Sequence, residues 1–193
     1  MCIRDRYKGD RIFINTGAVP VMLPIPGLKE SKYILDSTQA MDEKKMPKNL
    51  TIIGAGYIGL EFASMFAKYG SEVTVLDHNK EFLVREDEDI SNAVRKDMED
   101  AGIKFELGAD IEKITDEKTD AKVTYQINGK TKAINADRIL VATGRKPNTE
   151  NLGLENTAIE TTDHGAIKVD DFLRTTVDNV WAIGDVKGGL QFT

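Results

Sequence analysis

The chain has 193 residues, of which 40% are hydrophobic and 30% are charged, and its formal net charge is −6. This apolar fraction suits a folded domain rather than a disordered chain, and the interspersed acidic and basic residues argue against a nucleic-acid-binding surface. Because no apolar run approaches the roughly 18–20 residues of a membrane-spanning helix, and because the charged start is unlike a secretory signal, we expect a soluble, cytoplasmic protein.

The first part of the chain predicts little regular structure. A short apolar strand is expected over residues 11–15, followed by a proline-rich passage that ends at Gly27. A single strand is not stable alone, so it has to join a sheet formed by other parts of the chain. Residues 37–46 are interpreted as a short helix or connector that ends before Pro47.

From residue 50 onward, strands and helices alternate. Apolar residues recur at helical spacing in two segments, which predicts helices beginning near residue 58 and spanning 88–101, each followed by a glycine that can end it. Strands are predicted at 50–53, 72–76 and 104–107. This β-α-β-α-β order predicts a parallel sheet with helices, that is, an α/β fold of the Rossmann type.

The pattern changes after residue 110. Short strands without intervening helices indicate an antiparallel β-meander, at 111–114, 122–127, 130–134 and 138–142. Asn128-Gly129 between two of them is typical of a hairpin turn whose central residues have positive φ. The meander is expected to end in a loop over 142–148, and a last strand is predicted at 180–183.

The strongest motif is the glycine-rich loop over residues 54–59, between the first of the alternating strands and the helix that follows it. Gly54 permits a tight turn, Gly56 leaves the backbone open to a diphosphate, and Gly59 lets the helix pack closely on the strand. The helix start adds N–H groups and the positive end of its dipole. The context predicts a dinucleotide site; the alternative is a glycine turn that holds no ligand.

Asp77 is the candidate ribose ligand, because it stands at the end of the next strand, 18 positions after Gly59. A carboxylate there accepts hydrogen bonds from the adenosine ribose and repels a 2′-phosphate, so it favours NAD(H) over NADP(H). Two alternatives stay open. Asp77 can be a solvated strand-end acid, and His78, Lys80 and Arg85 can together cradle a 2′-phosphate.

Other polar residues have simpler explanations. The helix dipole alone favours Glu61 near a helix start, and Tyr57 can be a packing aromatic. His78 and His164 lie in polar surroundings without metal-ligand spacing, so we expect them at the surface. The acidic run 86–89 is interpreted as the solvated start of a helix rather than a metal site. No metal site is predicted.

Four short segments follow one another along the chain: residues 14–18 (Ile-Asn-Thr-Gly-Ala), 53–61 (Ile-Gly-Ala-Gly-Tyr-Ile-Gly-Leu-Glu), 142–148 (Ala-Thr-Gly-Arg-Lys-Pro-Asn) and 182–186 (Ala-Ile-Gly-Asp-Val). In this order they resemble the pyridine nucleotide–disulfide oxidoreductases, the flavoprotein family of glutathione reductase, dihydrolipoamide dehydrogenase and mercuric reductase. The resemblance covers residues 11–193. The Asn15-Thr16-Gly17 variant and the ending over 188–193 are most similar to the subgroup that reduces hypothiocyanous acid or protects against reactive chlorine.

The resemblance implies FAD and NAD(P)H as cofactors, with NADH favoured, and assigns residues to each. The NAD(P)H group would be Gly54, Ala55, Gly56, Tyr57, Ile58, Gly59, Leu60, Glu61, Asp77 and Gly144. The FAD group would be Thr16, Gly17, Arg145, Gly184, Asp185 and Thr193. Within these groups, Tyr57 would cover the flavin until the nicotinamide displaces it, Glu61 would pair with a lysine beside the flavin, and Asp185 would bind a ribityl hydroxyl.

The same resemblance predicts an internal fragment of a longer protein, because the family's first glycine-rich loop, its C-x4-C redox pair and its C-terminal dimerisation domain with a His-Glu pair are absent. Cys2 is the only cysteine and lies in a segment that matches no family motif. No catalytic residue is therefore predicted. The expected division is 1–46 and 156–193 as partial FAD-binding segments around a 47–155 NAD(P)H-binding domain, with Ile12, Phe13, Val180 and Trp181 exposed.

The implied reaction takes hydride from NAD(P)H to FAD and on to a disulfide or related acceptor, in a full-length parent that is a homodimer. No nucleic acid or membrane is expected as a partner. Two alternatives remain. The chain can be a dinucleotide-binding module without catalysis, or part of a two-dinucleotide flavoprotein reductase or oxidase that lacks redox cysteines.

Overall fold

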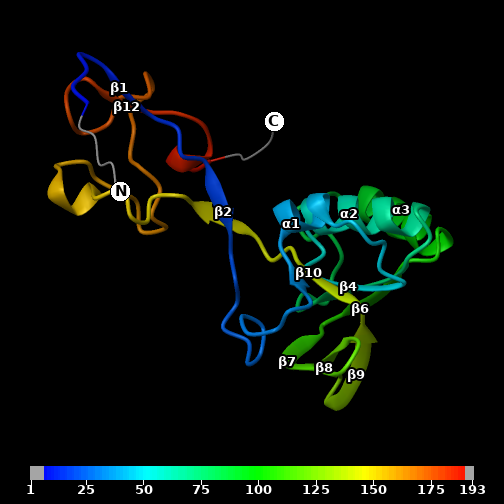
Figure 1. Ribbon diagram of the computed structural model, residues 1–193. Coiled ribbons are helices and arrows are strands. Elements are labelled where there is room, and N and C mark those ends of the chain that lie inside the picture. Colours follow the sequence, from blue (N-terminus) through cyan, green and yellow to red (C-terminus); the bar gives the residue numbers. More distant parts are fainter. Residues whose placement is uncertain (1–6, 190–193) are drawn as a thin grey trace. The chain divides into compact units, whose positions relative to one another are not determined.

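The computed structural model describes residues 7–189, which form two compact units (Figure 1). Residues 20–144 make up the larger unit, and residues 7–19 and 145–189 together make up the smaller one. The chain therefore begins in the smaller unit, passes through the larger unit and returns to the smaller one.

The larger unit is built on a five-stranded sheet in the order β3-β10-β4-β5-β6, in which every pairing is parallel. Its strands are β3 (Ile34–Leu35), β4 (Asn49–Ile53), β5 (Glu72–Asp77), β6 (Lys104–Leu107) and β10 (Arg138–Val141). The three central strands β10, β4 and β5 are rich in valine, isoleucine and leucine and are almost wholly buried, as expected for a sheet that is covered on both faces.

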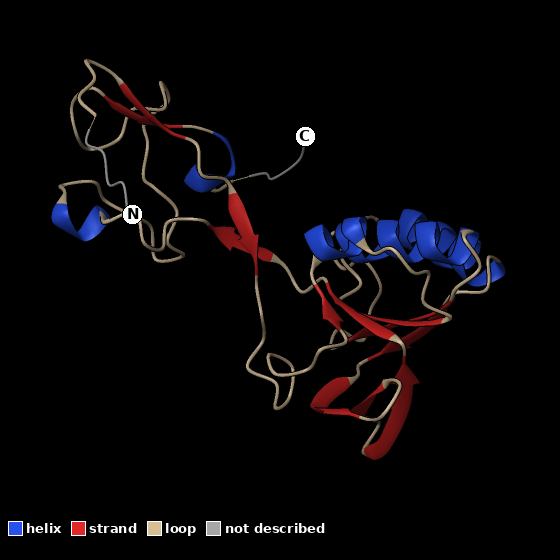
Figure 2. Cartoon of the chain, in the orientation of Figure 1, coloured by secondary structure: helices blue, strands red, loops and turns tan. Residues whose placement is uncertain are grey.

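Helices cover one face of this sheet (Figure 2). Within residues 7–189 the α-helices are α1 (Ser37–Asp42), α2 (Tyr57–Lys68) and α3 (Glu88–Asp100). Leu60 and Phe66 of α2 share a buried cluster with Ile52 of β4, and Met98 of α3 belongs to the same cluster. The helices predicted near residue 58 and over 88–101 are therefore confirmed, with their apolar faces on the sheet.

The antiparallel meander covers the other face of the sheet. It consists of β7 (Asp110–Asp116), β8 (Ala121–Ile127) and β9 (Lys130–Ala136). Val123 of β8 lies in a second buried cluster with Ile53 of β4 and Val141 of β10. Asn128 and Gly129 form the turn between β8 and β9 with φ of +51° and +72°, as the sequence predicts.

Two predictions about the end of the meander are wrong. Residues 138–142 do not belong to it, because β10 pairs in parallel with β3 and β4. The physical reason is the unbroken apolar run 139–141, which is buried on both faces and suits a central parallel strand. Residues 142–148 are not all loop either, because β11 (Arg145–Pro147) pairs with β2 (Ala18–Pro20).

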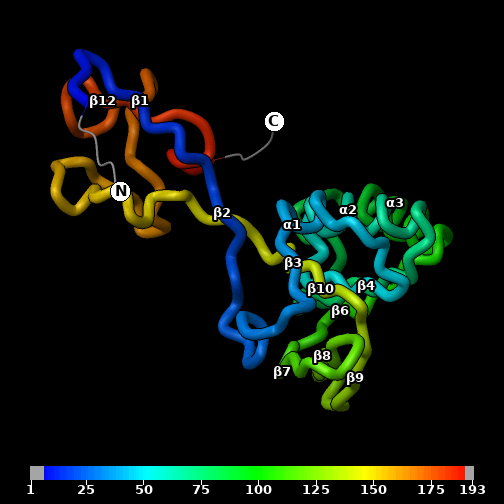
Figure 3. Tube along the Cα trace, in the orientation of Figure 1, coloured from blue at the N-terminus to red at the C-terminus, as the bar shows by residue number. Residues whose placement is uncertain are grey.

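The smaller unit has little regular structure. Its strands β1 (Ile12–Ile14) and β12 (Val180–Ala182) are far apart in the sequence but pair side by side in parallel (Figure 3). The unit also contains two short 3-10 helices, η1 (Leu154–Asn156) and η2 (Gly184–Lys187). Phe13 and Trp181 stack with their ring centroids 5.3 Å apart. A small cluster of Ile167, Ala182 and Val186 forms its core.

Exposure in this unit matches the prediction only in part. Ile12 and Phe13 are 47% and 58% exposed, and Trp181 is half-buried. The prediction for Val180 is wrong, because that side chain is only 8% exposed. The preceding loop folds back along β12 and lies beside Val180, because the N–H of Thr175 donates to the carbonyl oxygen of Val180 at 2.9 Å and the N–H of Val180 donates to the carbonyl oxygen of Val177 at 3.3 Å.

The borders of the two units differ from the predicted borders after residues 46 and 155. Segment 20–46 belongs to the larger unit because Leu28 is buried in the same cluster as Ile114, whose N–H donates to the carbonyl oxygen of Pro26 at 2.9 Å. The short β3 of this segment also extends the parallel sheet. The assignment of a cofactor to each unit stays a prediction.

Candidate functional site

The glycine-rich loop lies at the carboxyl ends of the parallel strands, where it joins β4 to α2. The strand order reverses at β4, because β5 and β6 follow on one side while β10 lies on the other. In open α/β sheets, ligands bind outside the carboxyl ends of the strands at such a reversal. The fold therefore places the loop where a ligand site is expected.

The three glycines have different surroundings. Gly54 has a φ of +107°, and a Cβ there would lie 2.5 Å from the carbonyl oxygen of Ala142. A Cβ on Gly59 would lie 2.1 Å from the carbonyl oxygen of Gly54, so α2 packs directly on the turn. A Cβ on Gly56 would meet no atom within 4 Å. Two glycines are thus required by packing, whereas Gly56 faces open space.

The start of α2 has no side-chain cap. Gly56 is its N-cap residue and offers no hydrogen-bonding side chain. In contrast, α1 is closed by a capping box in which Asp36 and Gln39 bond each other's backbone N–H groups. The first N–H groups of a helix carry the positive end of its dipole, so an uncapped start beside an open glycine can bind an anion.

Asp77, the last residue of β5, is 9% exposed and lies next to this loop. Its Oδ2 accepts a hydrogen bond from the N–H of Ala55 at 2.6 Å, and its Oδ1 accepts one from the N–H of Asn79 at 2.7 Å. Nδ1 of His78 is 3.6 Å from Oδ1. The alternative of a solvated strand-end acid therefore does not describe Asp77.

The loop after β5 carries the basic residues that could hold a 2′-phosphate. His78, Lys80 and Arg85 are all exposed, and so is the more distant His164. Their exposure leaves the alternative of a phosphate cradle open.

Tyr57 is 42% exposed, so it is not a core aromatic. Its hydroxyl donates a hydrogen bond to the carboxylate of Glu86. This bond raises the pKa of Tyr57 above its ordinary value, and the partial burial of the side chain is a second, smaller cause. The first residue of α2 is thus linked to the loop that precedes α3.

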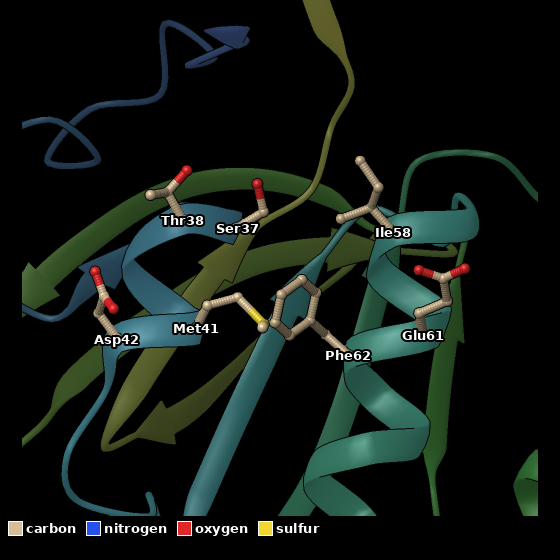
Figure 4. Close-up of a pocket in the computed structure, with 7 residues that line it drawn as sticks. All are labelled: Ser37, Thr38, Met41, Asp42, Ile58, Glu61 and Phe62. Atoms are coloured by element: carbon tan, nitrogen blue, oxygen red, sulfur yellow. The ribbon is translucent and has the colours of Figure 1, made fainter. Parts of the chain in front are cut away.

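Glu61 lies in a groove between α1 and α2 of about 470 Å³ (Figure 4). Met41 and Phe62 point toward each other across this groove, and Ile58 lines its end near the start of α2. Asp42 adds a second carboxylate. The groove therefore combines an apolar centre with two acidic side chains.

Gly144 lies near the same turn. Its carbonyl oxygen accepts the N–H of Val21 at 3.0 Å, while the hydroxyl of Thr143 donates to the carbonyl oxygen of Val21 at 3.1 Å. The N–H of Ala142 donates to the carbonyl oxygen of Ile53 at 2.8 Å, which holds the start of this passage beside the glycine-rich loop. All the residues predicted to bind NAD(P)H belong to the unit 20–144.

The described residues predicted to bind FAD belong to the smaller unit; Thr193 lies outside the described residues. Gly17 has a φ of +70°, and a Cβ there would meet nothing within 4 Å. Nη2 of Arg145 donates to the carbonyl oxygen of Ala18 at 2.5 Å. The described FAD group therefore has one open glycine and an arginine fixed close to it.

Gly184 and Asp185 begin η2, one residue after the end of β12. Gly184 has a φ of +69°, and a Cβ there would lie 2.6 Å from Oδ1 of Asn15. Asp185 is half-buried. The left-handed backbone at 184 therefore favours a glycine, and an added Cβ would displace the Asn15 side chain.

Asn148 is a residue that sequence reasoning missed. Its Nδ2 donates to the carbonyl oxygen of Thr16 at 3.0 Å, and the Thr16 hydroxyl donates to the carbonyl oxygen of Asn148 at 2.7 Å. The N–H of Asn148 also donates to the carbonyl oxygen of Gly17 at 2.9 Å. The only signal in the sequence was its place at the end of the segment 142–148.

Within residues 7–189, no His, Cys, Asp and Glu side chains gather in groups of three or more that could hold a metal ion. Cys2 lies outside that range. In the same part of the chain, the structure contains no helix whose length and hydropathy would suit it to span a bilayer.

Sequence relatives match nearly the whole length of this chain. Over 185 residues the chain is 45% identical to the probable pyridine nucleotide-disulfide oxidoreductase RclA of Escherichia coli (strain K12), covering 96% of this chain and 41% of the relative. It is 41% identical over 188 residues to the mercuric reductase of Bacillus cereus, covering 97% of this chain and 30% of the relative. The chain thus spans less than half the length of these relatives.

The fold of the chain is also similar to solved structures. The fold is similar to the HOCl-induced flavoprotein disulfide reductase RclA from Escherichia coli, with a TM-score of 0.91 and 44% identity over 96% of this chain and 42% of that chain. It is also similar to the water-forming NADH oxidase from Lactobacillus brevis bound to NADH, with a TM-score of 0.80 and 27% identity over 92% of this chain and 39% of that chain.

An engineered mutant of the Lactobacillus brevis oxidase, bound to NADPH, has a TM-score of 0.79 and 26% identity over 92% of this chain and 39% of that chain. Its replacements include a glycine-to-alanine and an aspartate-to-alanine change that are 18 positions apart. Residues 4–193 of this chain match the family described as pyridine nucleotide-disulphide oxidoreductase, and the chain therefore belongs to that family.

Proposed function

We propose that the protein to which this chain belongs is an NADH- and FAD-dependent oxidoreductase that reduces a disulfide or a related acceptor. The observation that carries the proposal is a combination of three features at the carboxyl ends of the parallel strands. They are the open backbone at Gly56, the uncapped start of α2 and the carboxylate of Asp77. An uncapped helix start suits a diphosphate, and an adjacent carboxylate suits a ribose.

The residues of the larger unit fit a nicotinamide dinucleotide. Because no atom lies within 4 Å of a Cβ placed on Gly56, the backbone there is open to the close approach of a phosphate. Gly54 and Gly59 keep the turn compact, and Asp77 would orient the adenosine ribose. When bound, the dinucleotide supplies hydride-transfer chemistry, while the protein positions it and excludes water.

NADH is the preferred form in this proposal. A carboxylate at the end of β5 repels a 2′-phosphate, and Gly59 is the glycine typical of NAD sites. The engineered NADPH-bound oxidase supports this choice, because its replaced glycine and aspartate have the same spacing of 18 positions that separates Gly59 from Asp77. In that protein both became alanine, which would remove such a carboxylate.

The smaller unit would hold part of the flavin. Gly17 is open, and Thr16 is held in place by Asn148. Asp185 follows a strand and has a half-buried carboxylate, which suits a hydroxyl-rich ligand. The similarity to the flavoprotein disulfide reductase RclA supports a flavin as that ligand and a disulfide as the acceptor class.

We propose that the complete protein acts as a homodimer.

Titration of the 193-residue chain with NADH, NADPH and FAD tests the proposal. We expect saturable binding of NADH, seen as enhanced nicotinamide fluorescence, and at least ten-fold weaker binding of NADPH. Absence of NADH binding would refute the assignment of the site. Bleaching of the flavin absorbance by NADH in the complete protein tests the reaction, and a protein without bound flavin would contradict it.

A further inference from the structure

Two successive N–H groups of the glycine-rich loop are held by two successive residues of β5. The N–H of Gly54 donates to the carbonyl oxygen of Leu76 at 2.8 Å, and the N–H of Ala55 donates to Oδ2 of Asp77 at 2.6 Å. The last regular pair between β4 and β5 is Ile53 with Leu76. The side chain of Asp77 therefore continues the hydrogen-bond ladder by one bond after β4 has ended.

The orientation of this carboxylate is fixed from both sides. Oδ1 accepts the N–H of Asn79, so neither oxygen can turn away without leaving a backbone N–H without its acceptor. Asp77 is 9% exposed and Ala55 is 7% exposed, so water has little access to replace either bond. A buried N–H that loses its acceptor carries its full desolvation cost.

We infer that Asp77 is a positioning residue for the diphosphate-binding loop, in addition to the ribose contact of the proposed function, on which this inference rests. Ala55 stands between Gly54, which is confined by Ala142, and Gly56, which faces open space. The bond to Ala55 sets the direction in which the backbone at Gly56 presents itself to the phosphates. The same carboxylate thus shapes the phosphate end of the site and selects the ribose end.

A ligand that has two phosphates but no ribose separates these two roles. The dissociation constants of NADH and of inorganic pyrophosphate, the latter from competition with NADH, are measured for the wild-type chain, Asp77→Ala and Asp77→Asn. We expect Asp77→Ala to weaken pyrophosphate binding about ten-fold, equivalent to about 1.4 kcal/mol, and NADH binding by at least as much. Asp77→Asn keeps one acceptor oxygen, so its loss should be about three-fold.

Asp137 offers a matched control at the opposite end of β4. Its Oδ2 accepts the N–H of Asn49 at 2.8 Å, a bond of the same kind as that between Asp77 and Ala55. Asp137→Ala should lower the melting temperature but leave both dissociation constants unchanged. This comparison separates loss of loop geometry from loss of stability.

The outcomes distinguish the two proposals. If folded Asp77 variants bind NADH more weakly but pyrophosphate as tightly as the wild type, Asp77 acts on the ribose alone and the inference is wrong. A wild-type chain that binds NADH but not pyrophosphate also contradicts it, because the loop would not recognise phosphates by itself. If Asp77→Ala does not fold, the Asp77→Asn measurement decides. Failure of the wild type to bind NADH instead refutes the proposed function.

Discussion

The hydroxyl of Tyr57 donates a hydrogen bond to the carboxylate of Glu86, a residue 29 positions further along the chain. Tyr57 is the first residue of α2, and Glu86 lies in the loop between β5 and α3. The bond therefore connects the segments that follow two neighbouring parallel strands. Because the carboxylate stabilises the protonated phenol, the pKa of Tyr57 lies above its ordinary value of 10.0.

Replacement of Glu86 by glutamine should lower the pKa of Tyr57 toward 10.0, because both the hydrogen bond to a charged acceptor and the negative charge are lost. The measurement is a titration of tyrosinate absorbance, with Tyr57→Phe used to assign the signal. Glu88→Gln removes an acid two residues further along the chain. It is the control and should leave the tyrosinate titration curve unchanged. An identical curve for Glu86→Gln and the wild type would contradict the contact.

Alanine at Gly56 should mainly weaken NADH binding, whereas alanine at Gly54 should mainly lower stability. Gly56→Ala places its methyl group in open space at an ordinary φ of −79°, so stability should change by about 1 kcal/mol or less while NADH affinity falls at least ten-fold. Gly54→Ala adds a Cβ 2.5 Å from a carbonyl oxygen at a φ of +107° and should cost about 2–4 kcal/mol. Thermal melts and NADH titrations check both; unchanged NADH affinity in Gly56→Ala would remove the main support for the site.

A chain limited to residues 20–144 should fold and bind NADH as tightly as the 193-residue chain. This unit contains the five-stranded sheet, its helices and the meander, with both of the buried clusters that cover the sheet. Circular dichroism and an NADH titration test this expectation. A folded but non-binding product would show that the smaller unit contributes to the NADH site.

Glu43 and Arg138 should make stability depend on acid pH. Nε of Arg138 donates to Oε2 of Glu43 at 2.7 Å, and this bond lowers the pKa of Glu43 from its ordinary value of 4.5. Because the pKa is lower in the folded than in the unfolded chain, the stabilisation is fully present above pH 4.5 and is lost as the pH falls through the lowered value.

Glu43→Gln should therefore unfold more easily than the wild type by about 1 kcal/mol at pH 7, and the difference should shrink as the pH falls below 4.5 and through the lowered pKa of Glu43. Urea unfolding across this pH range measures it. Glu160→Gln is the matched control, because the Glu160–Lys168 pair has a similar separation of 3.0 Å but side chains that are 61% and 50% exposed. A pH-independent difference for Glu43→Gln would rule out the ionised pair as its cause.

The parts of the site that sequence could predict are those encoded locally. The glycine loop, its flanking strand and helix, and Asp77 at the end of the next strand all depend on spacing within one βαβ unit, and the structure places them at one sheet edge. Local propensity determines such units because each element lies next to its neighbour in the sequence. The turn at Asn128-Gly129 could be predicted for the same reason.

The features that sequence could not predict depend on distant partners. β10 follows a meander strand in the sequence, yet it pairs between β3 and β4, where its apolar run is buried. The contacts of Asn148 with Thr16 join residues 132 positions apart, which no local pattern encodes. The carboxylate of Asp77 was predicted to face a ligand, but its bond to Ala55 emerged only from the geometry of the folded loop.

The unit 20–144 begins and ends at neighbouring points, since the N–H of Val21 donates to the carbonyl oxygen of Gly144 at 3.0 Å. A segment with adjacent ends can be accommodated within another domain by recombination without stretching either connection. In the proposed function this unit binds the nicotinamide dinucleotide, so it could be exchanged as a cassette during evolution, and the same two junctions are the natural points at which to graft a unit of altered cofactor preference.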